Sequence, residues 1–332
     1  MPYLPIYGWA DENGGVPAGS VRLFDRASLV ARMEEARRSK ERVMQDELSQ
    51  ALKLGEIRRL AGAPTSSALK RLEADFPHFA EVLLLIRQRT NLAHMLPGQV
   101  FSLPPLLLAG EPGVGKTAFA EALAKCLNQS MKRLDVASAT ASFALAGAHE
   151  TWSDARHGAV WSLLQAPSAS GVLLLDEIDK AAQGSYPVLG PLYSLLEPVS
   201  SKHFADEYVQ VPVDASHLIV VATCNDTSLM EPALLSRLRV VEVPAPSREQ
   251  MPAIARSVYR QLRATRPWGA VFSEELPMEV IERLSGSTPR ELSRLVDDAV
   301  GRAASAGRQY LLEEDINADP APTKTKHKLG FI

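Results

Sequence analysis

One run of eight residues has the residue types and spacing needed to hold a polyphosphate. Gly110, Gly115, Lys116 and Thr117 match the pattern of a glycine, four residues, a glycine, a lysine and a serine or threonine. In this pattern backbone N–H groups wrap the phosphates, the lysine reaches the β- and γ-phosphates, and the hydroxyl contacts Mg²⁺. The run predicts an ATP site, with a tight turn that binds no nucleotide as the alternative. The expected nucleotide-binding residues are Gly110, Glu111, Pro112, Gly113, Val114, Gly115, Lys116, Thr117 and Ala118.

The residues on either side of this run have the patterns of a strand and a helix. Leu106–Leu108 is a short apolar run, and residues 118–127 have a helical period. A strand that leads through a glycine-rich turn into a helix places phosphates at the helix N-terminus, where the peptide dipole is positive. This context favours the nucleotide interpretation over a plain turn.

Two carboxylates follow a second apolar run. Val172–Leu175 predicts a buried strand, and Asp176 and Glu177 come directly after it. Because the carboxyl ends of strands in a doubly wound sheet converge on the ligand crevice, Asp176 and Lys116 should meet there. We expect Thr117 and Asp176 to hold Mg²⁺, and Glu177 to polarise the water that attacks the γ-phosphate. The carboxylate pair is weak evidence alone and gains weight from the phosphate loop before it.

Alternating apolar runs and helical periods predict the scaffold around these residues. Apolar runs at 106–110, 131–137, 171–177, 217–225 and 240–244 predict an α/β fold with a five-stranded parallel sheet flanked by helices. After Pro246 only helical periods follow, which predicts a small all-α lid domain. The expected division is an arm with amphipathic helices at 1–70, a large α/β nucleotide-binding domain at 71–245, a helical lid at 246–318 and a flexible tail at 319–332.

The N-terminal arm has two kinds of sequence. Residues 1–20 are rich in proline and glycine and suggest an arm that lies on another surface. Residues 28–61 predict one or two amphipathic helices interrupted at Gly55, either solvated or used to dock a partner. Residues 63–67 read as a linker, and residues 79–96 as an apolar helix.

Composition excludes several classes of protein. The formal charge of −3, from 36 Lys and Arg against 39 Asp and Glu, gives no general field for nucleic acid or membrane. The start lacks the pattern of a secretion signal, and no apolar stretch approaches the roughly 18 residues of a membrane span. Cys126 and Cys224 lie in an expected helix and an expected strand, as buried thiols would. We therefore expect a soluble cytoplasmic protein.

Several strings resemble a known family. The motif DEIDK at 176–180 resembles that of AAA+ ATPases. The succession LLEP at 195–198, FADEYVQV at 204–211, ATCN at 222–225 and LLSR at 234–237 is similar to the ATPase module of Lon-type proteases. The resemblance covers roughly residues 75–315. It implies ATP and Mg²⁺ as cofactors and a homo-oligomeric ring, usually a hexamer, with nucleotide at each subunit interface.

The resemblance also implies roles for three further residues. Asn225 matches the sensor-1 residue that orients the attacking water, with a strand-capping asparagine as the alternative. Arg237 matches the arginine finger that reaches the γ-phosphate of the neighbouring subunit; the alternatives are a plain surface arginine and Arg239 in its place. Arg290 matches the sensor-2 arginine, and a phosphate partner would offset the unfavourable helix dipole at this helix start.

Two places depart from the Lon pattern. No Ser–Lys catalytic arrangement can be placed in residues 319–332, so we expect no proteolysis by this chain. Trp152 lies where the family has a pore loop, but Ser153 and Asp154 follow it in place of the usual aliphatic neighbour. Trp152 either contacts polypeptide in a pore or packs as an anchor.

The sequence predicts an ATP-driven remodeller or unfoldase of protein substrates. The alternative is an assembly module whose nucleotide state switches an oligomer that recruits an effector protein. Nucleic-acid remodelling is supported only by general analogy, and no membrane partner is expected. Residues 324–332 are basic with an apolar tip, and either dock into a partner or remain disordered.

Overall fold

The computed structural model describes residues 15–138, 140–149, 155–181 and 188–316. The chain divides by its internal packing into two compact units. The first comprises residues 1–73, 79–112 and 116–243, and the second comprises residues 74–78, 113–115 and 244–332. The middle of the glycine-rich loop is thus grouped with the second unit. The domain boundaries expected at 70, 245 and 318 stay predictions.

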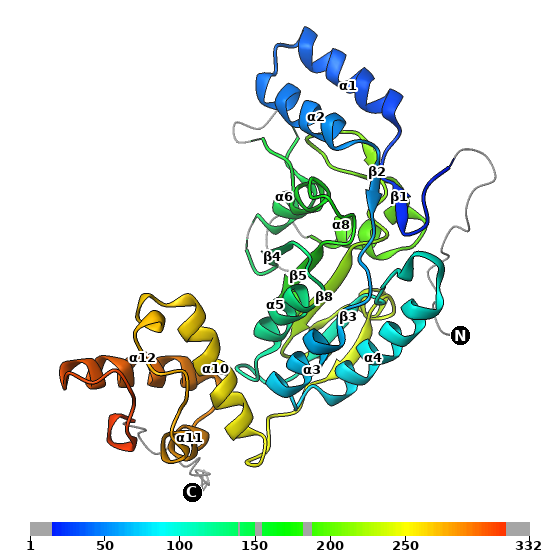
Figure 1. Cartoon of the computed structure of the whole chain (residues 1–332). Helices are drawn as coiled ribbons and strands as arrows, with labels where there is room; N and C mark the ends of the chain where they lie inside the picture. The colour runs from blue at the N-terminus through cyan, green and yellow to red at the C-terminus, as the bar shows by residue number, and fades with distance from the viewer. Residues whose placement is uncertain (1–14, 139, 150–154, 182–187, 317–332) are drawn as a thin grey trace, which may run out of the picture. The chain divides into compact units, whose positions relative to one another are not determined.

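A parallel sheet of five strands lies at the centre of the first unit, in the order β4-β5-β8-β3-β9 (Figure 1). The strands are β3 (Leu106–Ala109), β4 (Met131–Asp135), β5 (Val172–Asp176), β8 (Ile219–Cys224) and β9 (Arg239–Glu242). The central strands β3, β5 and β8 are buried along their whole length, whereas β4 at the sheet edge exposes Lys132 and Arg133. The expectation of a five-stranded parallel sheet flanked by helices is confirmed.

The register brings the functional strand ends together. β3, which leads into the glycine-rich loop, lies between β8 and β9, so that Leu106 pairs with Val221 on one side and Arg239 on the other. On the far side of β8, β5 pairs Leu175 with Ala222. Because all these strands are parallel, the residues that follow β3, β5 and β8 lie at the same edge of the sheet.

Helices connect and flank the strands (Figure 1). They are α3 (Ser66–Asp75), α4 (Ala80–Met95), α5 (Lys116–Cys126), α6 (Ala141–Ala146), α7 (Ala159–Leu164), α8 (Leu189–Leu196) and α9 (Pro232–Leu235). The linker expected at 63–67 is shorter, because Ser66 is the first residue of α3 and the Thr65 hydroxyl accepts a hydrogen bond from the Ala68 N–H (3.2 Å). Short 3₁₀ helices lie at Pro97–Gln99, Ile178–Lys180, Ser200–His203 and Thr227–Leu229.

The N-terminal segment forms two helices and a small antiparallel sheet. Helices α1 (Arg26–Arg38) and α2 (Arg42–Leu54) match the expected amphipathic pair, and Gly55 ends α2 with a φ of 85°. The pairing of β1 (Ser20–Arg22) with β2 (Ile57–Arg59) was not expected. Side chains from both helices share one hydrophobic cluster with the sheet; they are Leu29, Ala36, Met44, Leu48 and Ala51. One face of this helical pair is therefore buried within the chain.

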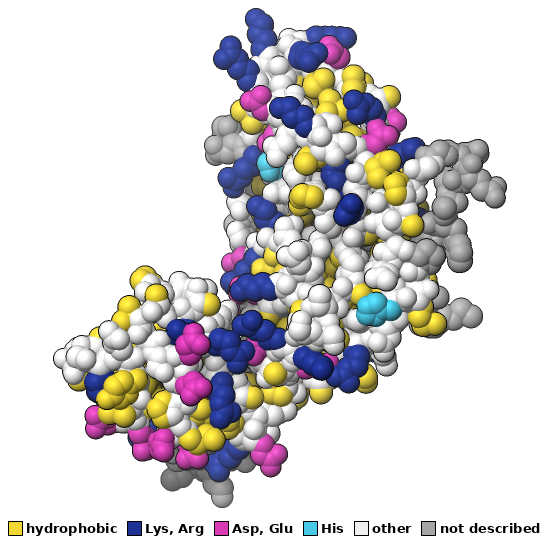
Figure 2. All heavy atoms as spheres, in the orientation of Figure 1, with side chains coloured by type: hydrophobic (Ala, Val, Ile, Leu, Met, Phe, Trp, Pro, Cys, Tyr) yellow, Lys and Arg dark blue, Asp and Glu magenta, His cyan; other side chains and the backbone are white. Residues whose placement is uncertain are grey.

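The other face of the helical pair is charged. Lys and Arg side chains gather over α1 and α2 in the space-filling view (Figure 2). The exposed basic residues there are Arg26, Arg37, Arg38, Lys40, Arg42 and Lys53. Among the helices that the structure describes, none is long and apolar enough to cross a membrane.

One buried carboxylate ties three segments of the first unit together. Asp206, between β6 (Phe204–Ala205) and β7 (Pro212–Val213), is fully buried. Its Oδ2 accepts a hydrogen bond from the N–H of Gly158 (2.7 Å), and its Oδ1 accepts from the N–H groups of Tyr208 (3.0 Å) and Val209 (3.2 Å). Burial raises the pKa of Asp206 to about 6, although these three donors act to lower it. His157, which precedes Gly158 in the chain, is hydrogen-bonded through Nδ1 to Glu47 of α2 (2.8 Å).

Replacing Asp206 with alanine should lower the free energy of unfolding by about 1–3 kcal/mol at neutral pH, because three buried N–H groups lose their acceptor. Chemical denaturation measures this, with Asp46→Ala, an exposed carboxylate on α2, as the matched control. A raised pKa means that the folded protein binds this proton more tightly than the unfolded chain. The stabilisation is therefore complete below the ordinary pKa of 3.8 and is lost as the pH rises through about 6.

The difference in the free energy of unfolding between wild type and Asp206→Ala should accordingly shrink by about 1–3 kcal/mol from about pH 4 to about pH 7. A difference that grows with pH over this range would show that Asp206 is stabilised as the carboxylate instead.

The second unit is built from helices, as expected after Pro246. They are α10 (Met251–Thr265), α11 (Met278–Ser285) and α12 (Pro289–Ser305), with 3₁₀ helices at Pro267–Ala270 and Glu313–Asp315. Tyr259, Leu284 and Val296 are among the residues of its separate hydrophobic core. Helix α12 begins with a capping box, in which the Glu291 carboxylate accepts a hydrogen bond from the Thr288 N–H (2.9 Å).

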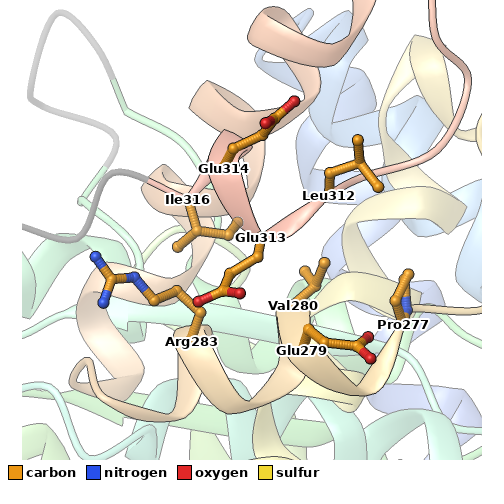
Figure 3. A pocket seen from close by; sticks show the side chains of 8 residues that line it. All are labelled: Pro277, Glu279, Val280, Arg283, Leu312, Glu313, Glu314 and Ile316. Carbon is orange, nitrogen blue, oxygen red and sulfur yellow. The ribbon is translucent and has the colours of Figure 1, made fainter.

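A shallow hollow of about 610 Å³ lies on the second unit between α11 and the segment after α12 (Figure 3). It is lined by Pro277, Glu279, Val280, Arg283, Leu312, Glu313, Glu314 and Ile316. Three of these residues are acidic and one is basic, so the hollow has an excess of negative charge. None of the residues predicted to bind nucleotide lines it.

Candidate active site

The glycine-rich loop depends on glycine for its backbone conformation at Gly113 and Gly115 and for lack of space at Gly110. Gly113 has a φ of 88°, and a Cβ on Gly110 would lie 2.4 Å from the carbonyl oxygen of Val243. The loop is held by His78, whose Nε2 is hydrogen-bonded to the carbonyl oxygen of Val114 (2.8 Å). Burial lowers the pKa of His78, which keeps the imidazole neutral at physiological pH. The loop conformation is thus supported from outside the motif.

Lys116, the first residue of α5, points its ammonium group back over the loop. Its Nζ donates hydrogen bonds to the carbonyl oxygens of Gly110 (2.6 Å) and Glu111 (3.0 Å) and to Oδ1 of Asn225 (3.1 Å). The side chain is buried, and burial lowers its pKa while the carboxylates of Asp179 and Asp176 act to raise it. The structure therefore brings together Lys116 and Asn225, two residues that the sequence singled out separately.

Asp176, at the end of β5, is the most heavily contacted carboxylate of the site. Its Oδ1 accepts hydrogen bonds from the hydroxyls of Thr223 (2.5 Å) and Thr117 (3.2 Å). Its Oδ2 lies 2.6 Å from Nη2 of Arg133 on β4. Thr117 and Asp176 thus meet, as expected for two ligands of one ion.

This donor set fits Mg²⁺. A hydroxyl and a carboxylate supply hard oxygen atoms, and Mg²⁺ usually takes one or two carboxylates together with phosphates and water. Within the described part of the chain, no group of three or more His, Cys, Asp or Glu side chains could hold a metal by itself. The pair Thr117 and Asp176 therefore suits an ion whose remaining ligands are water and phosphate oxygens.

Glu177 lies beside this pair in an unusual backbone conformation. Its φ of 57° is in the left-handed region, which is uncommon outside glycine and costs energy that the surrounding contacts must offset. The Glu177 N–H donates to the Thr223 hydroxyl (3.1 Å), and its carboxylate pairs with Nζ of Lys180 (2.5 Å). The hydrogen bond to Glu177 raises the pKa of Lys180.

Three residues of this cluster are not predicted by the sequence motifs. Thr223 contacts both Asp176 and Glu177, Arg133 pairs with Asp176, and Oδ2 of Asp179 accepts hydrogen bonds from the N–H groups of Asn225 (3.2 Å) and Asp226 (3.4 Å). Thr223 carried a detectable signal, because it is a polar residue near the end of an otherwise apolar strand. Arg133 carried none, since a basic residue on an edge strand is ordinary.

Known proteins are similar to this chain in sequence and in fold. Residues 106–245 match the model of AAA, the ATPase family associated with various cellular activities. Residues 106–245 form an AAA+ module. A chain of the S. cerevisiae Hsp104:casein complex in its extended conformation has the same fold, with a TM-score of 0.57, 19% sequence identity and coverage of 75% of this chain and 51% of that chain.

Relatives of this AAA+ module occur in Lon proteases. A Lon protease of Chloroflexus aurantiacus is 31% identical over 238 residues, which cover 69% of this chain and 28% of that protein. The peroxisomal Lon protease homolog 2 of Caenorhabditis briggsae is 30% identical over 224 residues, which cover 65% of this chain and 29% of that protein. The chain thus spans less than a third of the length of these relatives.

Arg237 of the AAA+ module lies apart from the Lys116 and Asp176 cluster. Its Nη1 donates to the carbonyl oxygen of Ala233 (2.6 Å), and its guanidinium lies 5.1 Å from the centroid of the Tyr193 ring. The Tyr193 hydroxyl in turn donates to Glu231 (2.6 Å). Arg239, the other candidate, lies 3.9 Å from Glu81. The contacts of Arg237 therefore hold it near the turn that follows α9.

Arg290 is the second residue of α12 and belongs to the second unit. In that unit a Cβ on Gly113 would lie 3.0 Å from the Cβ of Arg290. The expected pore residue Trp152 lies outside the described residues. The roles assigned to Arg237, Arg290 and Trp152 stay predictions.

Proposed function

We propose that this chain binds Mg²⁺-ATP and hydrolyses it to ADP and phosphate. The main support is that Lys116, Thr117, Asp176 and Asn225 converge at one edge of the sheet of an AAA+ module. Lys116 and Thr117 begin α5, whereas Asp176 ends β5 and Asn225 follows β8. A cation, a hydroxyl, a carboxylate and an amide at one point form the set that phosphoryl transfer uses for positioning and charge stabilisation.

Each residue has a distinct part in this proposal. Lys116 and the N–H groups of the glycine-rich loop would bind the β- and γ-phosphates, with Lys116 exchanging its carbonyl partners for phosphate oxygens. Mg²⁺, held by Thr117 and through water by Asp176, would neutralise phosphate charge. Glu177 would accept a proton from the attacking water, which requires its carboxylate to turn away from Lys180. Asn225 would orient that water.

Replacing Glu177 with glutamine should leave ATP affinity unchanged within about threefold and reduce turnover by about 10²-fold or more, because the amide cannot accept the proton. Phosphate release and the binding of a fluorescent ATP analogue measure the two effects. Lys180→Ala is the matched control, since it removes the same ion pair but keeps the carboxylate. Equal loss of turnover in both variants would assign the effect to the ion pair and contradict the proposed role of Glu177.

The proposed use of this hydrolysis is the remodelling or unfolding of proteins by a ring of subunits. Its support is the relation of the AAA+ module to Lon proteases, together with the half-exposed position of Arg237 in the turn after α9, where its contacts are to Ala233 and Tyr193. The test is loss of fluorescence from a folded fluorescent protein with an unstructured extension, with Glu177→Gln as the inactive control. Steady ATP turnover with no unfolding of any such protein would contradict this use.

The alternative is an assembly module in which nucleotide switches an oligomer that recruits an effector. It is favoured by the α1 and α2 pair, which is packed on the first unit and presents six exposed basic side chains (Figure 2). A surface fixed in this way suits stable docking of an acidic partner. Sedimentation velocity with ATP and with ADP distinguishes the two functions. Discrete assemblies that depend on nucleotide, without unfolding activity, would favour the switch.

A further inference from the structure

Arg133 has no part in the proposed function, yet from the neighbouring strand β4 it forms a short ion pair with Asp176, the carboxylate proposed to hold Mg²⁺. Its Nη2 lies 2.6 Å from Oδ2 of Asp176, which is nearly fully buried. Oδ1 of the same carboxylate is engaged by the hydroxyl of Thr223 at 2.5 Å, and Thr117 contacts both oxygens at 3.2 and 3.3 Å. The guanidinium therefore holds the oxygen that Thr223 leaves accessible.

From this geometry we propose that Arg133 competes with Mg²⁺ for Asp176 and so sets the Mg²⁺ concentration at which nucleotide binds. The inference rests on the proposed function of the site. A guanidinium and the hydrated metal seek the same lone pairs on Oδ2, and two cations a few ångströms apart repel each other. Bringing Mg²⁺ to Asp176 consequently requires breaking the ion pair to Arg133.

The position of Arg133 makes this exchange feasible. It belongs to β4, the edge strand of the sheet, and 54% of its side chain is exposed, against 9% for that of Asp176. The guanidinium can therefore move into water at low cost, whereas the carboxylate stays fixed by Thr223 and Thr117. Of the two partners, Asp176 is the fixed one and Arg133 the movable one.

The experiment is a titration of fluorescent ADP binding against Mg²⁺ concentration for the full chain. In Arg133→Ala the Mg²⁺ concentration for half-saturation should fall about three- to thirtyfold, the range expected for removal of one charge-assisted hydrogen bond that is partly screened by solvent. Arg133→Lys keeps the charge and loses the planar fork, so its Mg²⁺ concentration for half-saturation should lie between those of wild type and Arg133→Ala.

Lys132→Ala is the matched control, because it removes the same charge from the neighbouring exposed position of β4, whose side chain points to the other side of the strand. It should leave the Mg²⁺ dependence unchanged within about twofold. Binding of ADP in excess chelator should be the same in all variants, since the competition involves the metal alone. Thermal unfolding confirms that each variant is folded.

A second readout separates this inference from the proposed function. Titration of the nucleotide-free protein with Mn²⁺, followed by electron paramagnetic resonance, should show tighter metal binding in Arg133→Ala than in wild type. If wild type binds no nucleotide, the proposed function fails and the Mn²⁺ titration still decides the role of Arg133. The inference is overturned if Arg133→Ala, in either titration, binds the metal with an affinity equal to or lower than that of wild type.

Discussion

Replacing Lys116 with alanine is expected to weaken ATP binding at least about a hundredfold and to abolish measurable turnover. The ammonium group is the cation that the structure places over the glycine-rich loop, with Nζ 2.6 Å from the Gly110 carbonyl oxygen and 3.1 Å from Asn225. A charge-assisted contact to phosphate in a buried site is worth about 3 kcal/mol or more, and every 1.4 kcal/mol is a factor of ten in affinity. Equilibrium binding of a fluorescent ATP analogue measures the change.

The same variant also removes three hydrogen bonds that shape the loop, so its folding must be checked. Thermal unfolding in the absence of nucleotide should show a folded protein, and Lys70→Ala, an exposed lysine on α3, is the control for loss of charge. A folded Lys116→Ala protein that binds ATP with wild-type affinity would show that the glycine-rich loop is not the nucleotide site.

Replacing Arg237 with alanine is expected to leave ATP affinity nearly unchanged and to reduce turnover by about 10³-fold or more. This is the range for an arginine that stabilises charge in the transition state of phosphoryl transfer from a neighbouring subunit. Within its own chain Arg237 contacts Ala233 and Tyr193 rather than Lys116 or Asp176, as a residue that acts on a neighbour would. Phosphate release and nucleotide binding are measured as for Glu177→Gln. In the control variant Arg239→Ala, turnover should stay within about tenfold of wild type.

Mixing two inactive variants tests whether Arg237 acts between subunits. An Arg237→Ala subunit keeps Glu177, and a Glu177→Gln subunit keeps Arg237, so mixed rings contain some interfaces with both residues intact. Turnover should therefore recover on mixing, up to a modest fraction of the wild-type rate. Absence of recovery in mixed assemblies that are shown to form would place Arg237 outside the site of its neighbour.

The fold could be predicted from the sequence where local pattern decides it. Apolar runs such as Val172–Leu175 read directly as buried strands, and the three helical periods after Pro246 became α10, α11 and α12. The order of the strands could not be read in this way, because the pairing of Leu106 with Val221 and Arg239 is set by packing between distant segments. The three-residue strands β1 and β2 could not be predicted for the same reason, because segments this short become strands only through their pairing with each other.

For the candidate site too, local motifs could be predicted from the sequence and contacts between distant segments could not. Residues that belong to a contiguous motif, such as Lys116, Thr117 and Asp176, could be named beforehand, and the structure brings them together. Thr223 and Arg133 reach Asp176 only because β8 and β4 flank β5 in register, which no local spacing encodes. The sequence therefore identified the groups expected to contact the ligand, while the groups that hold or compete for them depended on the topology.

The place of β3 in the sheet has a consequence for the synthesis of the chain. β3 leaves the ribosome well before its two neighbours, β8 and β9, and has no sheet partner until residues up to Cys224 have followed. Until then the apolar segment Leu106–Ala109 has two unpaired edges, a condition that invites pairing with the wrong strand. The nascent chain is thus expected to acquire nucleotide binding in one late step, and to depend until that step on protection of its most apolar strands.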